Sequence, residues 1–352
     1  MAFAAISKPG LHMNTKLYTG DGSATQAITG VGFQPDWIWI KNRSYADHHK
    51  AVDRVRWVSS SNSAQLSPNQ TSAAGTQGII TSFDSDGFTL TTGDRGWNSS
   101  NGDNFVSWNW KANGQGSSNT DGTINTTYTS ASTTSGFSIS TWTGTGSNGT
   151  IGHGLGAVPK MLIIKSTSNT QAWMVYHVGP GNNSEGQITN GAFSASSTAW
   201  QDTDPTNQVF YVSGSAGDSV NASGYTYVGY AFAEVKGFSK IGSYTGNGNA
   251  DGTFVYTGFK PSWVMIKRYD SGTLDWNMYD NKRLGYNGGD APLFANLSNA
   301  ESNDYGRIDL VSNGFKIRTS NDQLANNGGS FLYMAFAGAP LVTSDNIPAT
   351  AG

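Results

Sequence analysis

The chain has 352 residues, with 45 glycines, 11 tryptophans, no cysteine and a formal net charge of −3 at pH 7. The lack of cysteine excludes disulfides and thiolate zinc sites, and the lack of a basic patch argues against nucleic-acid binding along phosphates. Aromatic residues make up 12% of the chain, which is enough apolar surface to build folded cores.

The first segment, residues 1–15, is predicted to be an extended N-terminal arm, because Lys8-Pro9-Gly10 forms turns rather than helix. The apolar stretch before Lys8 is too short for a secretory signal peptide. The chain contains no run of about 18 apolar residues, which is the length that a membrane-spanning helix needs. We therefore expect a soluble protein that is made in the cytoplasm and does not insert into membranes.

One pattern then occurs three times. Each copy has an aromatic residue followed by Thr-Gly-x-Gly, then a proline, then an apolar run that ends in lysine. The distance from the aromatic residue to the proline is 17 residues each time: 35 − 18, 159 − 142 and 261 − 244. The apolar runs are 37–41, 161–165 and 263–267. Equal spacings without a gap indicate a duplicated structural unit.

The apolar runs predict central strands that are covered on both faces. A proline suits the entry to such a strand, where its missing N–H costs little. We expect the tryptophans within strand patterns to fill cores: Trp37, Trp39, Trp108, Trp110 and Trp263. We expect each strand to emerge from the protein at its lysine: Lys41, Lys165 and Lys267.

Further strands are expected in every copy, and helix signals are scarce. A second aromatic strand is expected at 172–176 and 275–279, with a weaker counterpart at 50–53. Alternating strands are expected at 87–92 and 314–319, replaced in the second copy by 209–212, and closing strands at 106–112, 227–233 and 331–337. With only three glutamates in the chain, we predict an all-β fold of three tandem, related β-sandwich modules, jelly-roll-like, with little helix.

The predicted domain boundaries follow the repeat. They are an N-terminal arm at 1–15, β module 1 at 16–112, a Gly/Ser/Thr/Asn-rich linker at 113–135, β module 2 at 136–236, β module 3 at 237–340 and a C-terminal tail at 341–352. The composition of the linker favours a flexible connection.

Motifs for chemistry are weak. The run Gly144–Gly149 has dinucleotide-binding spacing, but residues 150–154 cannot begin the helix that such a site needs, so a turn is the better interpretation. The pair His48-His49 lacks a second cluster of metal ligands. Asp84 and Asp86 lie in a turn, where aspartate usually caps the backbone, and a calcium site there is the minority interpretation. We predict no catalytic residues, no cofactor and no metal.

Aromatic side chains in loops could instead form flat surfaces for sugar rings. The candidates for such exposed contacts are Trp97, Trp200 and Tyr286, which lie outside the strand patterns. For most other aromatic residues, packing in a core is the stronger interpretation.

The shared motifs carry a resemblance to a known family. They are Tyr-Thr-Gly-x-Gly, Gly-Phe-x-Pro-x-Trp with a lysine four residues after the tryptophan, Gly-Phe-x-[Leu/Ile] and the closing Tyr-Met-Ala-Phe-Ala at 333–337. Together they resemble uncharacterised virion proteins of tailed bacteriophages, common in marine phages, over nearly the whole chain. The resemblance implies a phage structural or tail-fibre-like protein and supplies no catalytic residues.

From the residues and this resemblance we expect a non-enzymatic virion surface protein, of the tail-fibre or host-attachment type. The alternative is a capsid decoration protein (cement or head fibre) that stabilises the shell, and a carbohydrate-active enzyme ranks third. The expected partners are other virion proteins of the capsid or tail and host surface polysaccharide, with no nucleic acid. Assembly into a homo-oligomer stays open.

Overall fold

The computed structural model describes residues 4–93, 95–99, 102–195, 198–214, 219–283, 287, 291–301 and 306–338. Within these residues the chain is all-β, as predicted, and its one named helical element is the short 3-10 helix η1 (Pro9–Leu11). No helix in the described part of the chain is long and apolar enough to cross a membrane.

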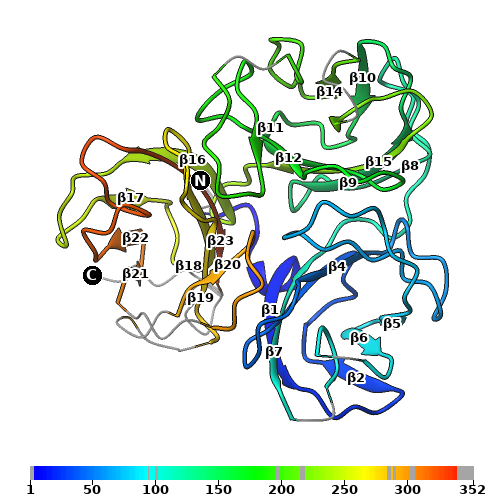
Figure 1. Ribbon diagram of the computed structural model, residues 1–352, viewed down its shortest axis with the longest axis horizontal. Coiled ribbons are helices and arrows are strands. Elements are labelled where there is room, and N and C mark those ends of the chain that lie inside the picture. Colours follow the sequence, from blue (N-terminus) through cyan, green and yellow to red (C-terminus); the bar gives the residue numbers. More distant parts are fainter. Residues whose placement is uncertain are drawn as a thin grey trace.

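The first repeat, residues 13–112, forms two antiparallel sheets (Figure 1). The larger sheet has the strand order β1-β7-β3-β4, and the smaller has the order β2-β6-β5. The bounds are β1 (Met13–Thr19), β2 (Gln26–Thr29), β3 (Trp37–Asn42), β4 (Lys50–Asp53), β5 (Ile80–Asp84), β6 (Gly87–Leu90) and β7 (Asn104–Trp110).

The second repeat, residues 113–236, has the same central strand order. Its large sheet runs β13-β12-β11-β15-β9-β8 and its small sheet pairs β10 with β14. The bounds are β8 (Tyr128–Ser132), β9 (Phe137–Thr143), β10 (Gly149–Gly152), β11 (Pro159–Ser166), β12 (Met174–His177), β13 (Gly186–Gln187), β14 (Val209–Val212) and β15 (Thr226–Ala233).

The third repeat, residues 237–338, again has a large sheet, β16-β23-β18-β19-β20, and a small one, β17-β22-β21. The bounds are β16 (Ser239–Thr245), β17 (Phe254–Tyr256), β18 (Pro261–Arg268), β19 (Asn277–Asp280), β20 (Leu293–Phe294), β21 (Ile308–Val311), β22 (Gly314–Ile317) and β23 (Ser330–Ala337). The order β1-β7-β3-β4 recurs as β9-β15-β11-β12 and as β16-β23-β18-β19. The sequence repeat is therefore a structural repeat, while the jelly-roll comparison stays a prediction.

Two segment predictions were wrong. The expected flexible linker at 113–135 contains β8, which pairs with β9 at the edge of the second large sheet. The backbone of β8 supplies the hydrogen-bond partners that the edge of β9 would otherwise lack. The expected arm at 1–15 overlaps β1, and its remainder packs on the protein: Ile6 is buried and Ala5 N donates to Lys236 O over 2.9 Å. The predicted tail at 341–352 lies outside the described residues.

Each large sheet is buried on both faces, as predicted from the apolar runs. The outer face packs against the small sheet of the same repeat, as Ile38 and Ile40 do against Phe88 and Leu90. The inner face packs into a central core that all three repeats share. Figure 1 accordingly shows three lobes arranged around a common centre.

Aromatic rings dominate this central core. Trp37 of the first repeat stacks on Tyr230 of the second, with ring centroids 4.4 Å apart, and lies 4.6 Å from Trp110. Trp110 meets Trp263 of the third repeat edge to face at 5.6 Å. Pairs of this kind contribute about 0.5–1.5 kcal/mol each beyond the area they bury. The core placement predicted for the five strand tryptophans is confirmed.

Candidate functional site

The last residue of β4, β12 and β19 links each repeat to another one. Tyr230 Oη of the second repeat donates to Asp53 Oδ2 of the first over 2.7 Å. His177 Nε2 of the second repeat lies 3.2 Å from a main-chain oxygen of the third, that of Tyr333. Trp108 Nε1 of the first repeat donates to Asp280 Oδ2 of the third over 3.0 Å. The three contacts form a closed ring of repeats.

The residue just before each of these strands makes a second set of links. Trp173 Nε1 donates to a carbonyl of the first repeat, at Ser67, over 3.0 Å. Trp276 Nε1 donates to a carbonyl of the second repeat, at Gln187, over 2.9 Å. At the matching position, His49 Nε2 lies 3.0 Å from a carbonyl of the third repeat. Each repeat is thus held to both others by buried polar groups.

His49 illustrates how these groups are kept in one protonation state. Its Nδ1 accepts a hydrogen bond from Trp39 Nε1 over 2.8 Å, so its Nε2 carries the proton and donates to the carbonyls of Phe294 and Leu297. Burial holds the pKa of His49 well below its usual value. The neutral imidazole therefore acts as a fixed connector rather than a proton carrier.

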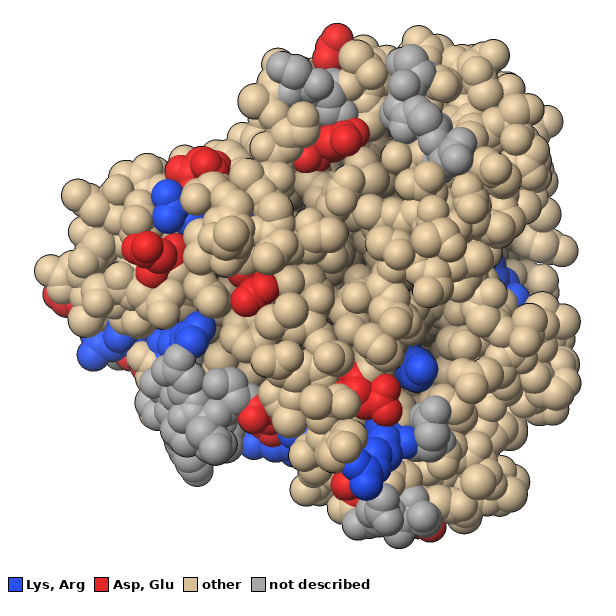
Figure 2. All heavy atoms as spheres, in the orientation of Figure 1, with Lys and Arg blue, Asp and Glu red and all other residues tan. Residues whose placement is uncertain are grey.

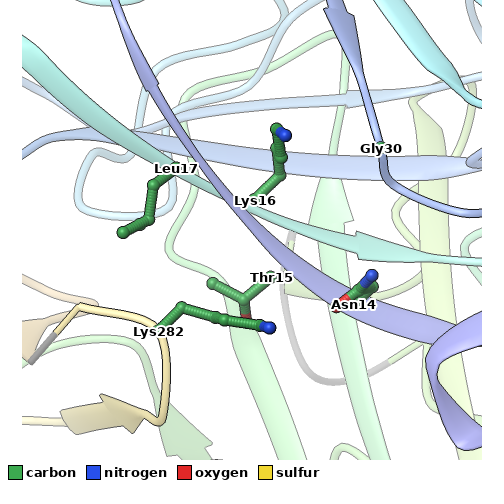
Figure 3. Close-up of a pocket in the computed structure, with 6 residues that line it drawn as sticks. All are labelled: Asn14, Thr15, Lys16, Leu17, Gly30 and Lys282. Atoms are coloured by element: carbon green, nitrogen blue, oxygen red, sulfur yellow. The ribbon is translucent and has the colours of Figure 1, made fainter. Parts of the chain in front are cut away.

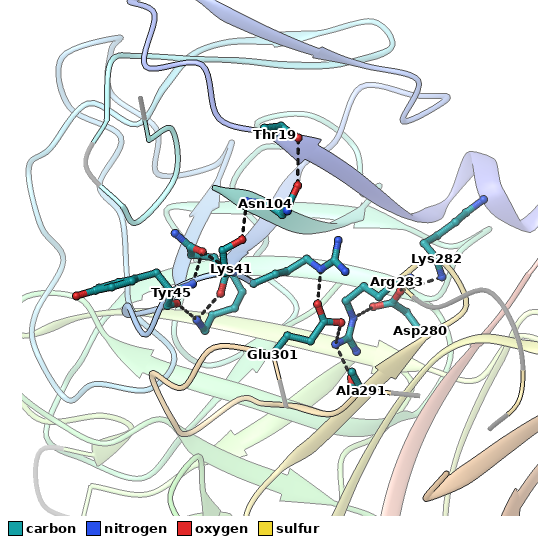
Figure 4. Close-up of polar contacts among 12 residues, drawn as sticks. Thr19, Lys41, Tyr45, Asn104, Asp280, Lys282, Arg283, Ala291 and Glu301 are labelled. Atoms are coloured by element: carbon teal, nitrogen blue, oxygen red, sulfur yellow. Dashed lines mark hydrogen bonds and ion pairs between the residues drawn. The ribbon is translucent and has the colours of Figure 1, made fainter. Parts of the chain in front are cut away.

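The seam between the first and third repeats, which are not consecutive in the chain, also carries an ion-pair network (Figure 4). Glu301 accepts from Arg43 Nε over 2.7 Å and from Arg283 Nη1 over 3.3 Å. Arg283 Nε also donates to Asp280 Oδ2 over 2.7 Å. The carboxylates and guanidiniums alternate, so no charge in this network is left without an opposite neighbour.

The three repeat lysines are buried, so the prediction that each strand emerges at its lysine was wrong. Lys41, Lys165 and Lys267 are fully buried, and burial lowers the pKa of each to about 8. Their amines donate to backbone carbonyls over 2.5–2.6 Å, at Asn42, Ser166 and Leu274 respectively. The flexible stem lets each lysine remain under its loop and satisfy carbonyls that the strands do not pair.

The two described aromatic residues predicted as exposed contacts are also buried. Trp97 is only 4% exposed and packs in the core between the two sheets of the first repeat. Trp200 is 1% exposed, and its Nε1 donates to Ser184 O over 3.0 Å. Both predictions were wrong because these loops fold back over the cores. Tyr286 lies outside the described residues.

Other aromatic side chains are exposed instead. Phe254 and Tyr256 flank the buried Val255 on the edge strand β17, and Tyr256 is 65% exposed. Tyr45 is exposed with the guanidinium of Arg95 lying 3.7 Å from its ring centre. In the sequence, two aromatic residues on either side of one valine predict this arrangement in β17, because alternate residues of a strand face opposite sides.

The remaining chemical candidates serve turns and loops. Asp86 accepts from the backbone N–H groups of Gly30 and Gly32 over 2.9 and 2.6 Å, so it caps the backbone of the loop after β2 rather than its own turn, and Asp84 accepts from the hydroxyls of Ser82 and Thr89. His48 contacts the side-chain amides of Asn69 and Gln70. Among the described residues, no group of three or more His, Asp or Glu side chains is placed to hold a metal ion.

One surface hollow of about 280 Å³ lies at the seam between the first and third repeats (Figure 3). Its walls come from β1, from the turn after β2 and from the turn after β19. The lining residues are Asn14, Thr15, Lys16, Leu17, Gly30 and Lys282. β1 is an edge strand of its sheet, so the hollow lies along an unpaired strand edge. It is the candidate binding site.

Fold and site together define an all-β protein in which three repeats are joined in a closed ring. A hollow lined by two lysines lies at the seam between the first and third repeats. The chain belongs to the family described as a domain of unknown function, DUF7483, whose model matches residues 8–340. That match spans all three repeats. No curated protein and no solved structure matches the chain.

Proposed function

We propose that this protein is a non-enzymatic surface component of a tailed-phage virion, of the tail-fibre or host-attachment type. The repeat motifs that resemble such virion proteins support this assignment. The structural observation that carries it is the closed ring, in which buried contacts join three repeats into one body. Such a body can present several loops at once, and weak contacts made together gain avidity.

The use of the buried ionisable groups also supports a structural role. Asp53 is held by Arg56 and Tyr230, and Asp280 by Arg283 and Trp108. These side chains are engaged in linking repeats and lie away from solvent, so they serve assembly of the protein rather than reaction with a substrate.

The surface fits contact with polar partners such as polysaccharide. Figure 2 shows one face of the molecule, on which charged side chains are sparse and scattered among other residues. Exposed aromatic residues such as Tyr256 add flat contact area. In this proposal the partners are capsid or tail proteins on one side and host surface polysaccharide on the other.

A capsid decoration protein is the second candidate, and the cyclic order of the repeats favours it. A body with three related lobes matches the local symmetry of a threefold position in a shell. The N-terminal arm is a poor anchor for that role, because residues such as Ile6 are buried against the protein's own body.

Labelling intact particles tests the two candidates. Gold-conjugated antibody against the purified chain should mark the tail, and purified chain should compete with particles for adsorption to host cells. Label over the whole shell would replace the attachment proposal with decoration. Release of oligosaccharide from host polysaccharide by the purified chain would overturn the non-enzymatic assignment.

A further inference from the structure

The hollow at the seam contains a buried hydroxyl that the fold does not use. Thr15 is only 5% exposed, and its Oγ1 has no hydrogen-bond partner. The matching positions, three residues before the aromatic residue of each repeat, are Ile139 and Ile241, and both are buried. Leaving such a hydroxyl unpaired costs about 1–3 kcal/mol, whereas a branched apolar side chain fits this position in the other two repeats.

Lys282 distinguishes this seam from its counterpart. It lies two residues after Asp280, and the residue two after His177 is Gly179. Gly179 lies close to Ser243 of the third repeat, since a Cβ added to the glycine would be 3.1 Å from the serine Cβ. At this position the second and third repeats therefore touch each other. At the matching position between the third and first repeats, the chain carries the exposed Lys282 instead.

The hollow has a positive charge balance. Figure 3 shows the amine of Lys282 on the same side of β1 as Thr15, with Lys16 on the other side, toward Gly30. Within the described residues, neither amine forms a hydrogen bond or ion pair. The carboxylate of Asp86 already accepts from two backbone N–H groups, which lower its pKa, and the charge of Lys16 lowers that pKa further. Lys16 and Lys282 are the charged residues among those that line the hollow, and the neighbouring carboxylate of Asp280 is paired with Arg283, so the lining is cationic.

We propose that this hollow binds one acidic sugar unit. The carboxylate would lie between Lys282 and the Thr15 hydroxyl, and the sugar ring would cover Leu17 with Lys16 at the far side. An ammonium and a hydroxyl are complementary donors for a carboxylate. Ligand pockets commonly enclose about 300–1,000 Å³, so this hollow suits a single unit. The inference rests on the proposed attachment to host polysaccharide and names the class of sugar.

Calorimetric titration of the full chain tests the site, with methyl glucuronide and N-acetylneuraminate as acidic probes. Neutral methyl glucoside and inorganic sulfate serve as comparisons. We expect an acidic sugar to bind at least about tenfold more tightly than either. Binding of sulfate as tight as that of the sugars would mean a site for free anions and would overturn the proposal, as would no binding of either acidic probe.

Three variants locate the binding. Thr15→Val keeps the shape of the side chain and removes the hydroxyl, and Lys282→Gln removes the charge. Each should weaken binding about tenfold, while Lys260→Gln, at an exposed lysine that does not line the hollow, should leave it unchanged. A Thr15→Val protein that melts cooperatively and binds with unaltered affinity would contradict the assignment. Particle labelling is independent of this result, so the two proposals can fail separately.

Discussion

The phenol of Tyr230 donates a 2.7 Å hydrogen bond to Oδ2 of Asp53, a residue 177 positions earlier in the chain. The same carboxylate accepts from Arg56 Nε over 2.8 Å. Burial first, and then the charge of Asp53, raise the pKa of Tyr230 well above its usual value. The phenol therefore stays protonated at a pH where an exposed tyrosine would ionise, and it joins the first repeat to the second.

Removing this phenol should weaken the fold. Tyr230→Phe leaves the buried carboxylate with one donor fewer, and a hydrogen bond to a charged group contributes about 1.5–3 kcal/mol. We expect the free energy of unfolding in urea to fall by about 2 kcal/mol. Tyr256→Phe is the matched control, because Tyr256 is 65% exposed. Equal stability of the two variants would show that the Tyr230 contact contributes nothing.

Neutralising Glu301 should loosen the seam between the first and third repeats. Glu301→Gln leaves the guanidiniums of Arg43 and Arg283 without their shared carboxylate, and breaking a buried pair on one side costs about 3–5 kcal/mol. Because Glu301 is partly exposed, we expect a loss of about 2–3 kcal/mol. Hydrogen exchange should quicken in β1 and β19 but not in β11 and β12.

The control for that experiment is Glu234→Gln. Glu234 pairs with Lys240, and both side chains are more exposed than those of the seam network. Surface pairs contribute about 0–1 kcal/mol, so little change is expected. Uniform exchange across all strands in the Glu301 variant would argue against a local opening of the seam.

Stability should rise with pH between about 8 and 10. The pKa of Lys41, Lys165 and Lys267 is about 8 in the folded protein and near 10.5 when exposed. In this window the unfolded chain holds more protons than the folded one, so raising the pH favours folding, by about 1.4 kcal/mol per pH unit per lysine. Urea unfolding at a series of pH values measures the slope, which Lys165→Met should reduce by about a third.

The opposite sign is expected above pH 10. Burial raises the pKa of Tyr18, Tyr230 and Tyr244 well above 10.0. The unfolded chain then loses protons that the folded protein retains, so stability falls. A curve that is flat from pH 8 to pH 10 would contradict the lowered pKa of the lysines.

Replacing the unpaired hydroxyl should stabilise the protein. Thr15→Val removes a buried donor without a partner, which costs the wild type about 1–3 kcal/mol. We expect the free energy of unfolding to increase by about 1 kcal/mol. Ser107→Ala is a useful comparison, since Ser107 is buried but its hydroxyl accepts from Asn109 over 3.0 Å, and that variant should lose stability. A less stable Thr15→Val protein would mean that the hydroxyl is satisfied within the fold.

The repeat could be predicted because it is local. Equal spacing from aromatic residue to proline and an apolar run after it are properties of neighbouring residues, and strand periodicity follows from them. The all-β class and the buried strand tryptophans such as Trp37 and Trp263 followed directly. The strand β8 was missed because its Ser and Thr residues resemble a linker in composition until a neighbouring edge pairs with them.

The candidate site could not be predicted in the same way. Trp97 and Trp200 lie in loops, a position that predicts exposure, but loop composition does not tell which loops fold back over a core. Thr15 and Lys282 are 267 residues apart (282 − 15), and nothing local brings them together. When the three repeats are aligned, Thr15 stands at the position that Ile139 and Ile241 occupy in the other two. This polar residue at an otherwise apolar position is the sequence signal for the hollow.

The sequence by itself determined the strand-rich class, the number of repeats and the apolar strand at the heart of each, since these depend on composition and short-range periodicity. Only the tertiary structure decided that the repeats close into a ring, that Lys41, Lys165 and Lys267 are buried, and that a hollow lies at the seam between the first and third repeats. These features arise from contacts between distant segments. Their energies depend on which donors, acceptors and rings meet, and strand periodicity does not encode that information.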